Sequence, residues 1–314
     1  MVTGEIAAEK QKSLTIKGAR APWWERNMGW VLVAPVLAMF VVFALIPSIT
    51  VVLYAFSRVK LIRGNIQRTY IGLDNFRRAI DDPLVVQSVK ITIKWMLGVT
   101  IAEVVLGLLL ALLLTQNIPF RPVVTSLLII PIIMPPVSVA VAWLFMYDIN
   151  FGIYNYFLSL LNIGPVSWLT DRNIALYSVM IVDIWQATPF VFLLLYAGLL
   201  SLPRDPYEAA AIDGANAFRI FRTVTLPLLR PVFLVVILLR LIDAARIFDK
   251  IFVMTQGGPG SATYSMTYTI YIRAFTTFDL GYSAALSFLF QFGLIIIATI
   301  YVRRVLADYA APAS

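Results

Sequence analysis

The chain has 314 residues, 60% hydrophobic and 13% charged, with a mean hydropathy of +0.85; such composition excludes a soluble globule and indicates an integral membrane protein. The absence of cysteine and histidine excludes disulfides, Cys/His metal sites, imidazole bases and cysteine nucleophiles. The formal charge of +8 is scattered over loops and termini without an aromatic-interleaved basic patch, which favours anionic lipid and topology signals over nucleic acid.

Six apolar runs are long enough to cross about 30 Å of hydrocarbon. A polar tail, residues 1–28, comes first, and the run after it is about twice the length of a signal-peptide core, so we expect an uncleaved first span. No strand alternation, repeat or soluble domain stands out. The sequence predicts an all-α polytopic membrane domain over 29–306 and a short tail, 307–314. The runs cover 29–56, 87–115, 123–147, 174–200, 231–254 and 282–306.

Lysine and arginine residues indicate the orientation of the chain in the membrane. Six spans put both termini on one side, together with the loop 201–230. The segments on that side hold twelve of these cations, against eight on the other side. Because positively charged segments stay inside, we expect both termini and this loop to be cytoplasmic.

The third span is interrupted by Pro131, Pro135 and Pro136. Prolines break the hydrogen-bond ladder of a helix, which a membrane protein tolerates where neighbouring helices or water satisfy the freed carbonyls. The interruption is either a fixed kink or a moving element.

Polar residues inside the spans mark the candidate solute path, because a charge at a helix centre costs about 2.5–3.5 kcal/mol on insertion scales. The fourth span carries Asp183, Trp185 and Gln186. An aromatic ring with hydrogen-bonding side chains is the usual combination for holding a sugar. The alternative is that these residues bond neighbouring helices. Glu103, in the second span, is expected to pair with Lys94 or a partner helix.

The fifth span carries Arg240 and Asp243 near the membrane midplane, and Asp249 and Lys250 near its outer interface. Arg240 and Asp243 lie three residues apart on one helix. Three roles are open: the two residues neutralise each other, they act in gating or in contact with a partner permease, or they bind solute. The last two are expected to snorkel towards the interface.

Between the fourth and fifth spans lies a polar segment, SLPRDPYEAAAIDGANAFRIFRTVTLPLLRP, residues 201–231. We expect Asp205 to cap a short helix that ends at Gly214 in the left-handed conformation. A second helix should run from about Asn216 to Thr225, with Pro227 ending it. An amphipathic loop on a membrane surface is one explanation. Helices this short need a packing partner.

This segment resembles the EAA signature of inner-membrane permease subunits of binding-protein-dependent ABC importers. The order is Glu208-Ala209-Ala210, three residues, Gly214, nine residues, then Val224-Thr225-Leu226-Pro227, with Val224 where the family has isoleucine. Other segments resemble the carbohydrate-uptake class of these permeases. They are 70–76, Glu103, Gly107-Leu108, Ala111, Arg121, Pro131, Pro135, Trp143, 152–155, 240–249 and 255–260.

The resemblance implies a type I ABC importer permease fold and a transport subunit that is not an enzyme and carries no cofactor. The loop 201–230 would act as a coupling helix on a separate ATPase, which binds ATP and Mg. The implied partners are a second homologous permease, two ATPase subunits and an external solute-binding protein, at a bacterial or archaeal inner membrane. The ATPase-coupling residues would be Glu208, Ala209, Ala210, Asp213, Gly214, Phe218, Leu226 and Pro227.

The absence of a GxxxxGK[ST] motif fits this implication, because the chain itself should not bind ATP through a P-loop. Two other function classes remain open. One is a secondary transporter or channel that uses the intramembrane charges as an ion relay. The other is an assembly scaffold with no transport path.

Overall fold

The computed structural model describes Trp23 and residues 27–62, 65–116 and 118–310. The chain divides into two compact units, Met1–Leu53 and Tyr54–Ser314. The first unit contains α3 (Met28–Phe40), the π-helical turn η1 (Val41–Leu45) and most of α4 (Ile46–Ala55). The predicted N-terminal tail lies almost wholly outside the described residues, as do the last residues of the predicted C-terminal tail.

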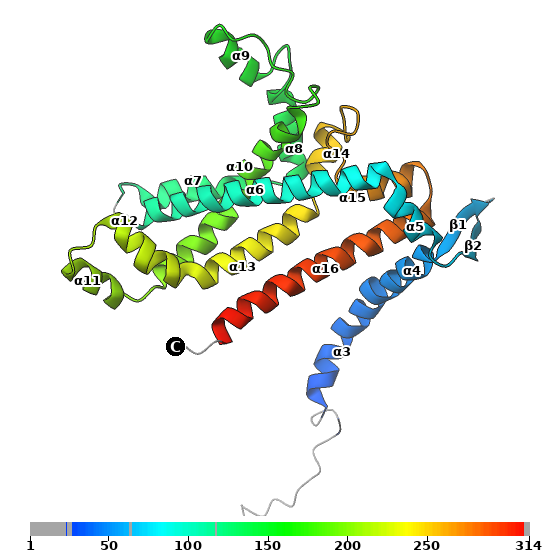
Figure 1. Cartoon of the computed structure of the whole chain (residues 1–314), viewed down its shortest axis with the longest axis horizontal. Helices are drawn as coiled ribbons and strands as arrows, with labels where there is room; N and C mark the ends of the chain where they lie inside the picture. Colours follow the sequence, from blue (N-terminus) through cyan, green and yellow to red (C-terminus); the bar gives the residue numbers. More distant parts are fainter. Residues whose placement is uncertain (1–22, 24–26, 63–64, 117, 311–314) are drawn as a thin grey trace, which may run out of the picture. The chain divides into compact units, whose positions relative to one another are not determined.

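The second unit is almost entirely helical (Figure 1). Its elements are β1 (Ser57–Ile62), β2 (Asn65–Tyr70), α5 (Asp74–Asp81), α6 (Pro83–Thr115), α7 (Arg121–Ile133), α8 (Pro136–Met146), α9 (Ile153–Leu160), α10 (Ala175–Leu200), α11 (Asp205–Ile212), α12 (Ala217–Ile220), η2 (Phe221–Thr225), α13 (Leu226–Ala245), α14 (Asp249–Met254), α15 (Met266–Tyr271), η3 (Ile272–Thr276) and α16 (Leu280–Ala310).

In the described part of the chain, five helical segments are long and apolar enough to cross a membrane, and α7 with α8 makes a sixth if the two count as one span. Each coincides with one of the six predicted runs. The predicted all-α, six-span fold is therefore confirmed. The fifth segment begins at Ala217, well before residue 231, because the loop helix and the span are continuous.

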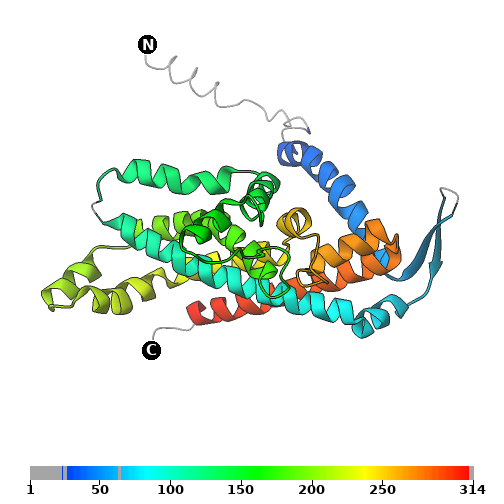
Figure 2. The same cartoon turned by 90° about the horizontal axis from the view of Figure 1, so that it is seen from above.

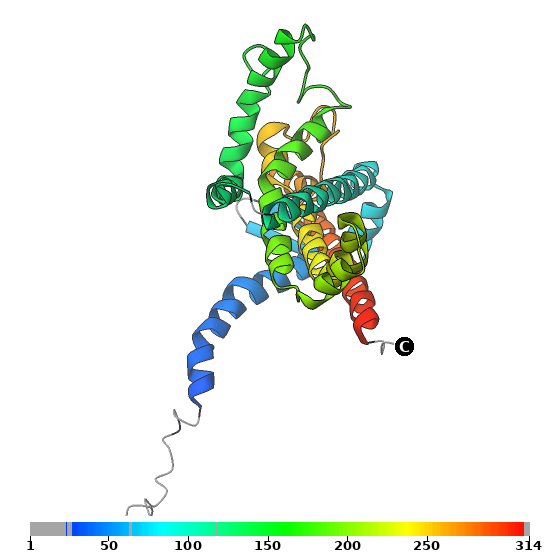
Figure 3. The ribbon, with the colours of Figure 1, turned by 90° about the vertical axis from the view of Figure 1, so that its left-hand side faces the viewer.

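The third span is sharply bent. The axes of α7 and α8 meet at 96°, and Figure 3 looks nearly along α7 while α8 rises from its end. Met134 and Pro135 between them are extended, with ψ of 135° and 134°. An extended residue before a proline avoids the clash with the proline ring, so Pro135 and Pro136 place the break that the sequence predicts.

Pro227 does not end a helix, contrary to the prediction. It lies inside a helical run that passes from α12 through η2 into α13. In η2 the backbone bonds shift by one residue, so that the Leu226 N–H bonds the Phe221 carbonyl. The wider turn accommodates the proline, whose ring clashes with a carbonyl in a regular helix. The same arrangement precedes Pro47, where η1 lies two residues upstream.

A β-hairpin follows α4, although no strand pattern was expected from the sequence. β1 and β2 pair antiparallel, with Ser57 opposite Tyr70. Only one side of β1 packs inward, with Val59 buried between exposed Arg58 and Lys60. Strands this short and polar carry little hydrophobic periodicity. The Asn75 side chain anchors the hairpin by donating to the Ser57 carbonyl (3.0 Å).

The core of the second unit lies where α6 and α10 pack together. Gly107 allows a close approach to the α10 backbone, because a Cβ there would lie 2.7 Å from Cγ1 of Val191 and 3.0 Å from the backbone nitrogen of Phe192. Small residues let membrane helices approach in this way. α10 also packs against α13, with Gly198 facing Val232.

Gly107→Ala should therefore destabilise the bundle, although alanine is the better helix former. The added methyl group meets backbone as well as side chain, and overpacking of this kind costs about 1–3 kcal/mol. The check is the melting temperature of the purified protein in detergent. Gly293→Ala is the matched control, since its Cβ would meet nothing within 4 Å. Equal melting temperatures of the two variants would contradict this packing.

Within the second unit, α11 and α12 lie at one end and α5 with the hairpin lies at the other (Figure 2). The segment 201–230 thus projects from one end of the bundle. Arg240 lies near the opposite end of α13, the helix that continues from this segment.

Candidate functional site

The fifth span is broken after α13. The Arg246 N–H bonds the Asp243 carbonyl (3.0 Å) in a tightened last turn, and helix resumes only at Asp249 in α14. The Ile247 carbonyl in the gap accepts a hydrogen bond from the Ser265 hydroxyl (3.0 Å). An irregular backbone at membrane depth is tolerated only where it is buried in protein or lines a cavity.

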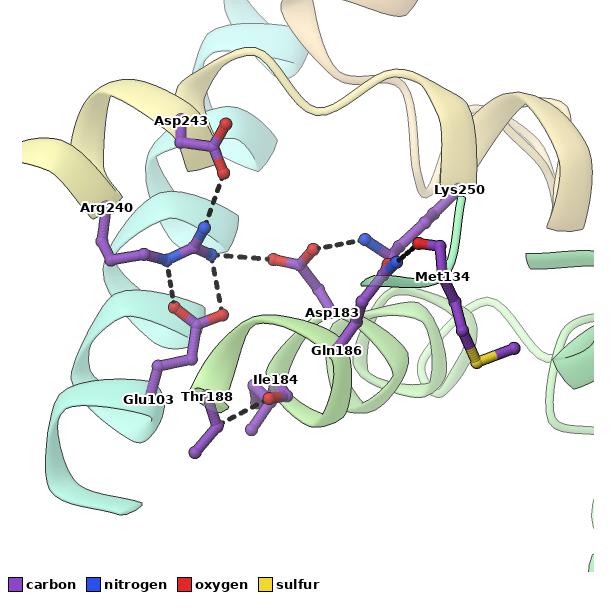
Figure 4. Close-up of polar contacts among 9 residues, drawn as sticks. All are labelled: Glu103, Met134, Asp183, Ile184, Gln186, Thr188, Arg240, Asp243 and Lys250. Carbon is purple, nitrogen blue, oxygen red and sulfur yellow. Dashed lines mark hydrogen bonds and ion pairs between the residues drawn. The ribbon is translucent and has the colours of Figure 1, made fainter. Parts of the chain in front are cut away.

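Arg240, just before this break, is the centre of a buried charge cluster (Figure 4). Its guanidinium donates to both carboxylate oxygens of Glu103 on α6, from Nε at 2.5 Å and from Nη2 at 2.8 Å. Nη2 also reaches Oδ2 of Asp183 on α10 (3.3 Å). Nη1 donates to Oδ2 of Asp243 (2.6 Å). One arginine thus joins three helices.

Asp183 extends the cluster to α14. Its Oδ1 accepts a hydrogen bond from Nζ of Lys250 at 2.7 Å, and the side chains of both residues are less than a tenth exposed. Lys250 therefore lies on the far side of the α13–α14 break and is tied back to α10. It does not snorkel to an interface as expected, because a buried carboxylate is within reach.

Burial makes this pairing obligatory. An unpaired ion in a low-dielectric interior is penalised by several kcal/mol, and excellent geometry with further hydrogen bonds is needed to offset that penalty. Glu103 is fully buried and Arg240 is 3% exposed, and each charge has a partner of opposite sign within hydrogen-bonding distance. The cluster therefore locks α6, α10, α13 and α14 together.

The second broken helix meets the same region. Nε2 of Gln186 on α10 donates to the Met134 carbonyl (2.9 Å), which the α7–α8 break leaves without a helical partner. The amide oxygen of Gln186 is buried and has no hydrogen-bond partner among the described residues. Two helix breaks thus flank Asp183 and Gln186.

A cavity of about 460 Å³ opens between the two breaks. The carboxylate of Asp243 faces it with a side chain 70% exposed. Arg246, one turn further on, is exposed, and no ion pair with it occurs in the part of the chain that the structure describes. The lining residues are Ile132, Met134, Pro136, Asp183, Gln186, Ala187, Phe190, Leu239, Arg240, Ile242, Asp243, Arg246 and Lys250.

Trp185 is not brought to this cavity. Its ring lies against Trp143, with centroids 5.7 Å apart, in an aromatic cluster that continues through Tyr154 and Tyr147 to Trp168. Of the residues singled out in the fourth and fifth spans, Asp183, Gln186, Arg240 and Asp243 line the cavity. Trp185 lies on another face of α10.

The segment 201–230 forms the two short helices expected of it. Asp205 is the first residue of α11 and not its cap, since Arg204 occupies the cap position without a side-chain bond. Gly214 has φ +71°, the left-handed conformation that glycine adopts without strain. Asn216 caps α12 by accepting from the Arg219 N–H (2.9 Å).

Two large apolar side chains of this segment are left uncovered by the described residues. Ile212 is 86% exposed and Phe218 is 71% exposed, and Glu208 and Ala209 beside them are also exposed. The Tyr207 hydroxyl donates to Thr225 (3.1 Å) and ties α11 to η2. The other predicted coupling residues, Ala210, Asp213, Gly214, Leu226 and Pro227, are exposed or half-buried.

Comparison with known proteins shows the family to which the chain belongs. A family model described as "Binding-protein-dependent transport system inner membrane component" matches residues 103–313. The chain belongs to this family. The match includes Glu103, the cavity and the segment 201–230, and it confirms the resemblance to inner-membrane permease subunits of ABC importers.

Individual relatives of this permease share much of its length. It is 37% identical over 258 residues to the trehalose/maltose transport system permease protein MalF of Thermococcus litoralis. The aligned region covers 82% of this chain and 85% of the relative. It is 31% identical over 293 residues to the sn-glycerol-3-phosphate transport system permease protein UgpA of Shigella flexneri, covering 92% and 98%. The fold is similar to a chain of a bacterial ABC transporter involved in the import of the acidic polysaccharide alginate, with a TM-score of 0.80, 20% identity, and coverage of 90% and 96%.

The permease sequence did not predict the charged partners of two members of the cluster, Glu103 and Lys250. Glu103 pairs with Arg240 on α13, and not with Lys94, which lies over the Tyr177 ring at 4.4 Å. Lys250 pairs with Asp183. The sequence does indicate that charged residues inside the spans pair with one another, because unpaired charges in a membrane are rare. It does not indicate which residues pair, because the partners are far apart in the sequence.

Proposed function

We propose that this chain is one transmembrane subunit of an ATP-driven importer for a sugar or sugar-like solute, and that it couples half of the solute path to a separate ATPase. One observation carries the proposal. Helix runs without interruption from Ala217 in α12 to Ala245 in α13. At ~1.5 Å per residue, about 35 Å of helix links the start of α12 to Arg240 at the cavity.

The solute path in this proposal passes through the cavity between the two helix breaks. Broken helices at membrane depth are where transporters bind solute. Asp183, Gln186, Arg240 and Asp243 supply hydrogen-bonding groups there. Asp183 and Arg240 also hold the surrounding helices, so they position the path as well as line it.

The segment 201–230 is the proposed contact with the ATPase, on the cytoplasmic side together with both termini. Exposed Ile212 and Phe218 provide apolar anchors, and Glu208 and Ala209 lie beside them. Large apolar side chains that are this exposed on two short helices are available to pack against a partner. When ATP draws two ATPase subunits together, α11 and α12 move with them, and α13 carries the movement to the cavity.

The complete importer in this proposal contains a second homologous permease, two ATPase subunits that bind ATP and Mg, and an external solute-binding protein, in a bacterial or archaeal inner membrane. Family membership supports this composition, since the family is described as binding-protein-dependent. No covalent step takes place on this chain.

The test is purification of the tagged chain from its native membrane in mild detergent, followed by reconstitution in liposomes. We expect an ATPase to co-elute and uptake of solute to require ATP and the binding protein. Uptake by this chain alone under an ion gradient would support a secondary transporter instead and would overturn the proposal. A complex with ATPase that moves no solute would indicate an assembly scaffold.

A further inference from the structure

The β-hairpin carries a concentration of positive charge. Residues 57–70 include three arginines and one lysine, and no aspartate or glutamate. Arg58 and Lys60 are exposed on either side of buried Val59. Because successive side chains of a strand point to opposite faces, these two cations lie on the same face of β1. The residues of β2, with Arg68 among them, are all exposed.

The two cations on this face have no counter-charge within the part of the chain that the structure describes. Arg58 lies opposite Thr69, and Lys60 lies opposite Gln67. Neither cation forms an ion pair there. Opposite charges directly across an antiparallel pair stabilise it, so these neutral partners leave a positive charge that the hairpin does not itself neutralise.

A recess of about 390 Å³ lies beside this face of the hairpin. Its charged lining residues are Arg58, Lys60, Asp74, Arg78 and Asp279. Arg78 is already paired with Asp279 at 2.6 Å. The charges that remain are two cations and one carboxylate, so the recess has both room and net positive charge for an acidic group.

The hairpin is fixed at its base. The Asn75 side chain donates to the carbonyls of Ala55 (2.9 Å) and Ser57 (3.0 Å). Gly281, at the start of α16, lies so close that a Cβ there would overlap the Ser57 carbonyl oxygen. A fixed base presents the two cations in one geometry, and such preorganisation lowers the entropy cost of binding a partner.

The position of the hairpin indicates what kind of partner it meets. Figures 1 and 2 both show it beyond the ends of α6 and α16, at the end of the second unit opposite α11 and α12. In the proposed function that end is external. Cations on short external loops oppose the positive-inside rule, so membrane orientation does not account for them. A projection beyond the spans is better placed to contact a soluble protein than the lipid headgroups around the spans.

We propose that the hairpin docks on an acidic surface of the external solute-binding protein, with Arg58 and Lys60 as the charged contacts and a partner carboxylate in the recess. The inference rests on the proposed function, which supplies a binding protein at this end of the importer. Complementary charges across an interface speed association and suppress wrong partners. The hairpin would therefore act mainly on the rate at which the binding protein is captured.

The test measures association between the complete importer, purified in phosphatidylcholine nanodiscs through a tag on this chain, and the binding protein that supports its uptake. The double variant Arg58→Gln, Lys60→Gln should slow association at least about fivefold at low salt, because charge steers the encounter. The difference should largely disappear between about 0.1 M and about 1 M salt, as the Debye length falls from ~10 Å to ~3 Å.

A second variant tests the same face without removing a cation. Gln67→Glu places a carboxylate opposite Lys60, which stabilises the strand pair, so slower association by this variant cannot be attributed to unfolding. The double variant Arg303→Gln, Arg304→Gln is the matched control. It makes the same change in net charge on exposed residues near the far end of α16, and it should associate as the unmodified importer does.

Unchanged association by both hairpin variants, or equal slowing by the control, would overturn the inference. Association that depends on added phosphatidylglycerol and not on the hairpin charges would assign these cations to lipid and overturn it as well. Uptake separates this failure from that of the proposed function. ATP-dependent uptake by the unmodified importer, with normal association by the hairpin variants, overturns only the inference. An unmodified importer that takes up no solute with ATP and the binding protein overturns the proposed function.

Discussion

Replacing Arg240 by methionine should remove most of the folded protein from the membrane. The substitution leaves Glu103 fully buried without a partner and takes one of two partners from Asp183. Removing one member of a buried ion pair costs about 3–5 kcal/mol, a large part of the stability of a typical domain. The measurement is the yield of monodisperse protein in detergent, together with its melting temperature.

The double variant Glu103→Gln, Arg240→Met is the diagnostic control for this result. It removes both charges of the central pair, so it should recover part of the yield that Arg240→Met loses. If Arg240→Met alone were as stable as the unmodified protein, the cluster would not hold α6, α10 and α13 together.

Glu208→Lys should abolish uptake while the protein still inserts and folds. Glu208 is exposed on α11, so the change leaves the bundle untouched. At the proposed ATPase contact a reversed charge would be juxtaposed with groups arranged for a carboxylate, which costs several kcal/mol. At about 1.4 kcal/mol per factor of ten, uptake should fall at least ~100-fold.

The check is ATP-dependent uptake by proteoliposomes that contain equal amounts of each variant. Glu208→Gln keeps the shape of the side chain without its charge and should retain a measurable part of the activity. Unchanged uptake by Glu208→Lys would exclude the segment 201–230 as the transmission element.

The six spans and the helix–glycine–helix segment were predictable because each rests on local chemistry. Apolar runs of sufficient length predict spans wherever they pack. Gly214 ends α11 with a positive φ, and Asn216 caps α12, both as short-range sequence rules require. Such features need no knowledge of the tertiary structure.

Other features depend on contacts between distant segments and could not be predicted. Arg240 and Glu103 are 137 residues apart, and nothing in either local sequence specifies the other. Pro227 continues a helix because the turn before it widens, which the residue pattern does not encode. The three prolines of the third span indicated a break, but not its 96° angle or the hydrogen bond from Gln186, 52 residues further on, to the Met134 carbonyl at the break.

In the proposed mechanism, movement of the segment 201–230 reaches the cavity through α13. The chain has no cysteine, so Leu239→Cys, which lies in the cavity lining and is 43% exposed in its native form, provides a single reporter. We expect its maleimide labelling rate in the reconstituted importer to differ at least about fivefold between the nucleotide-free and ATP–vanadate states, and Glu208→Lys to abolish that difference. Equal labelling rates in the two states of the active importer would contradict this mechanism.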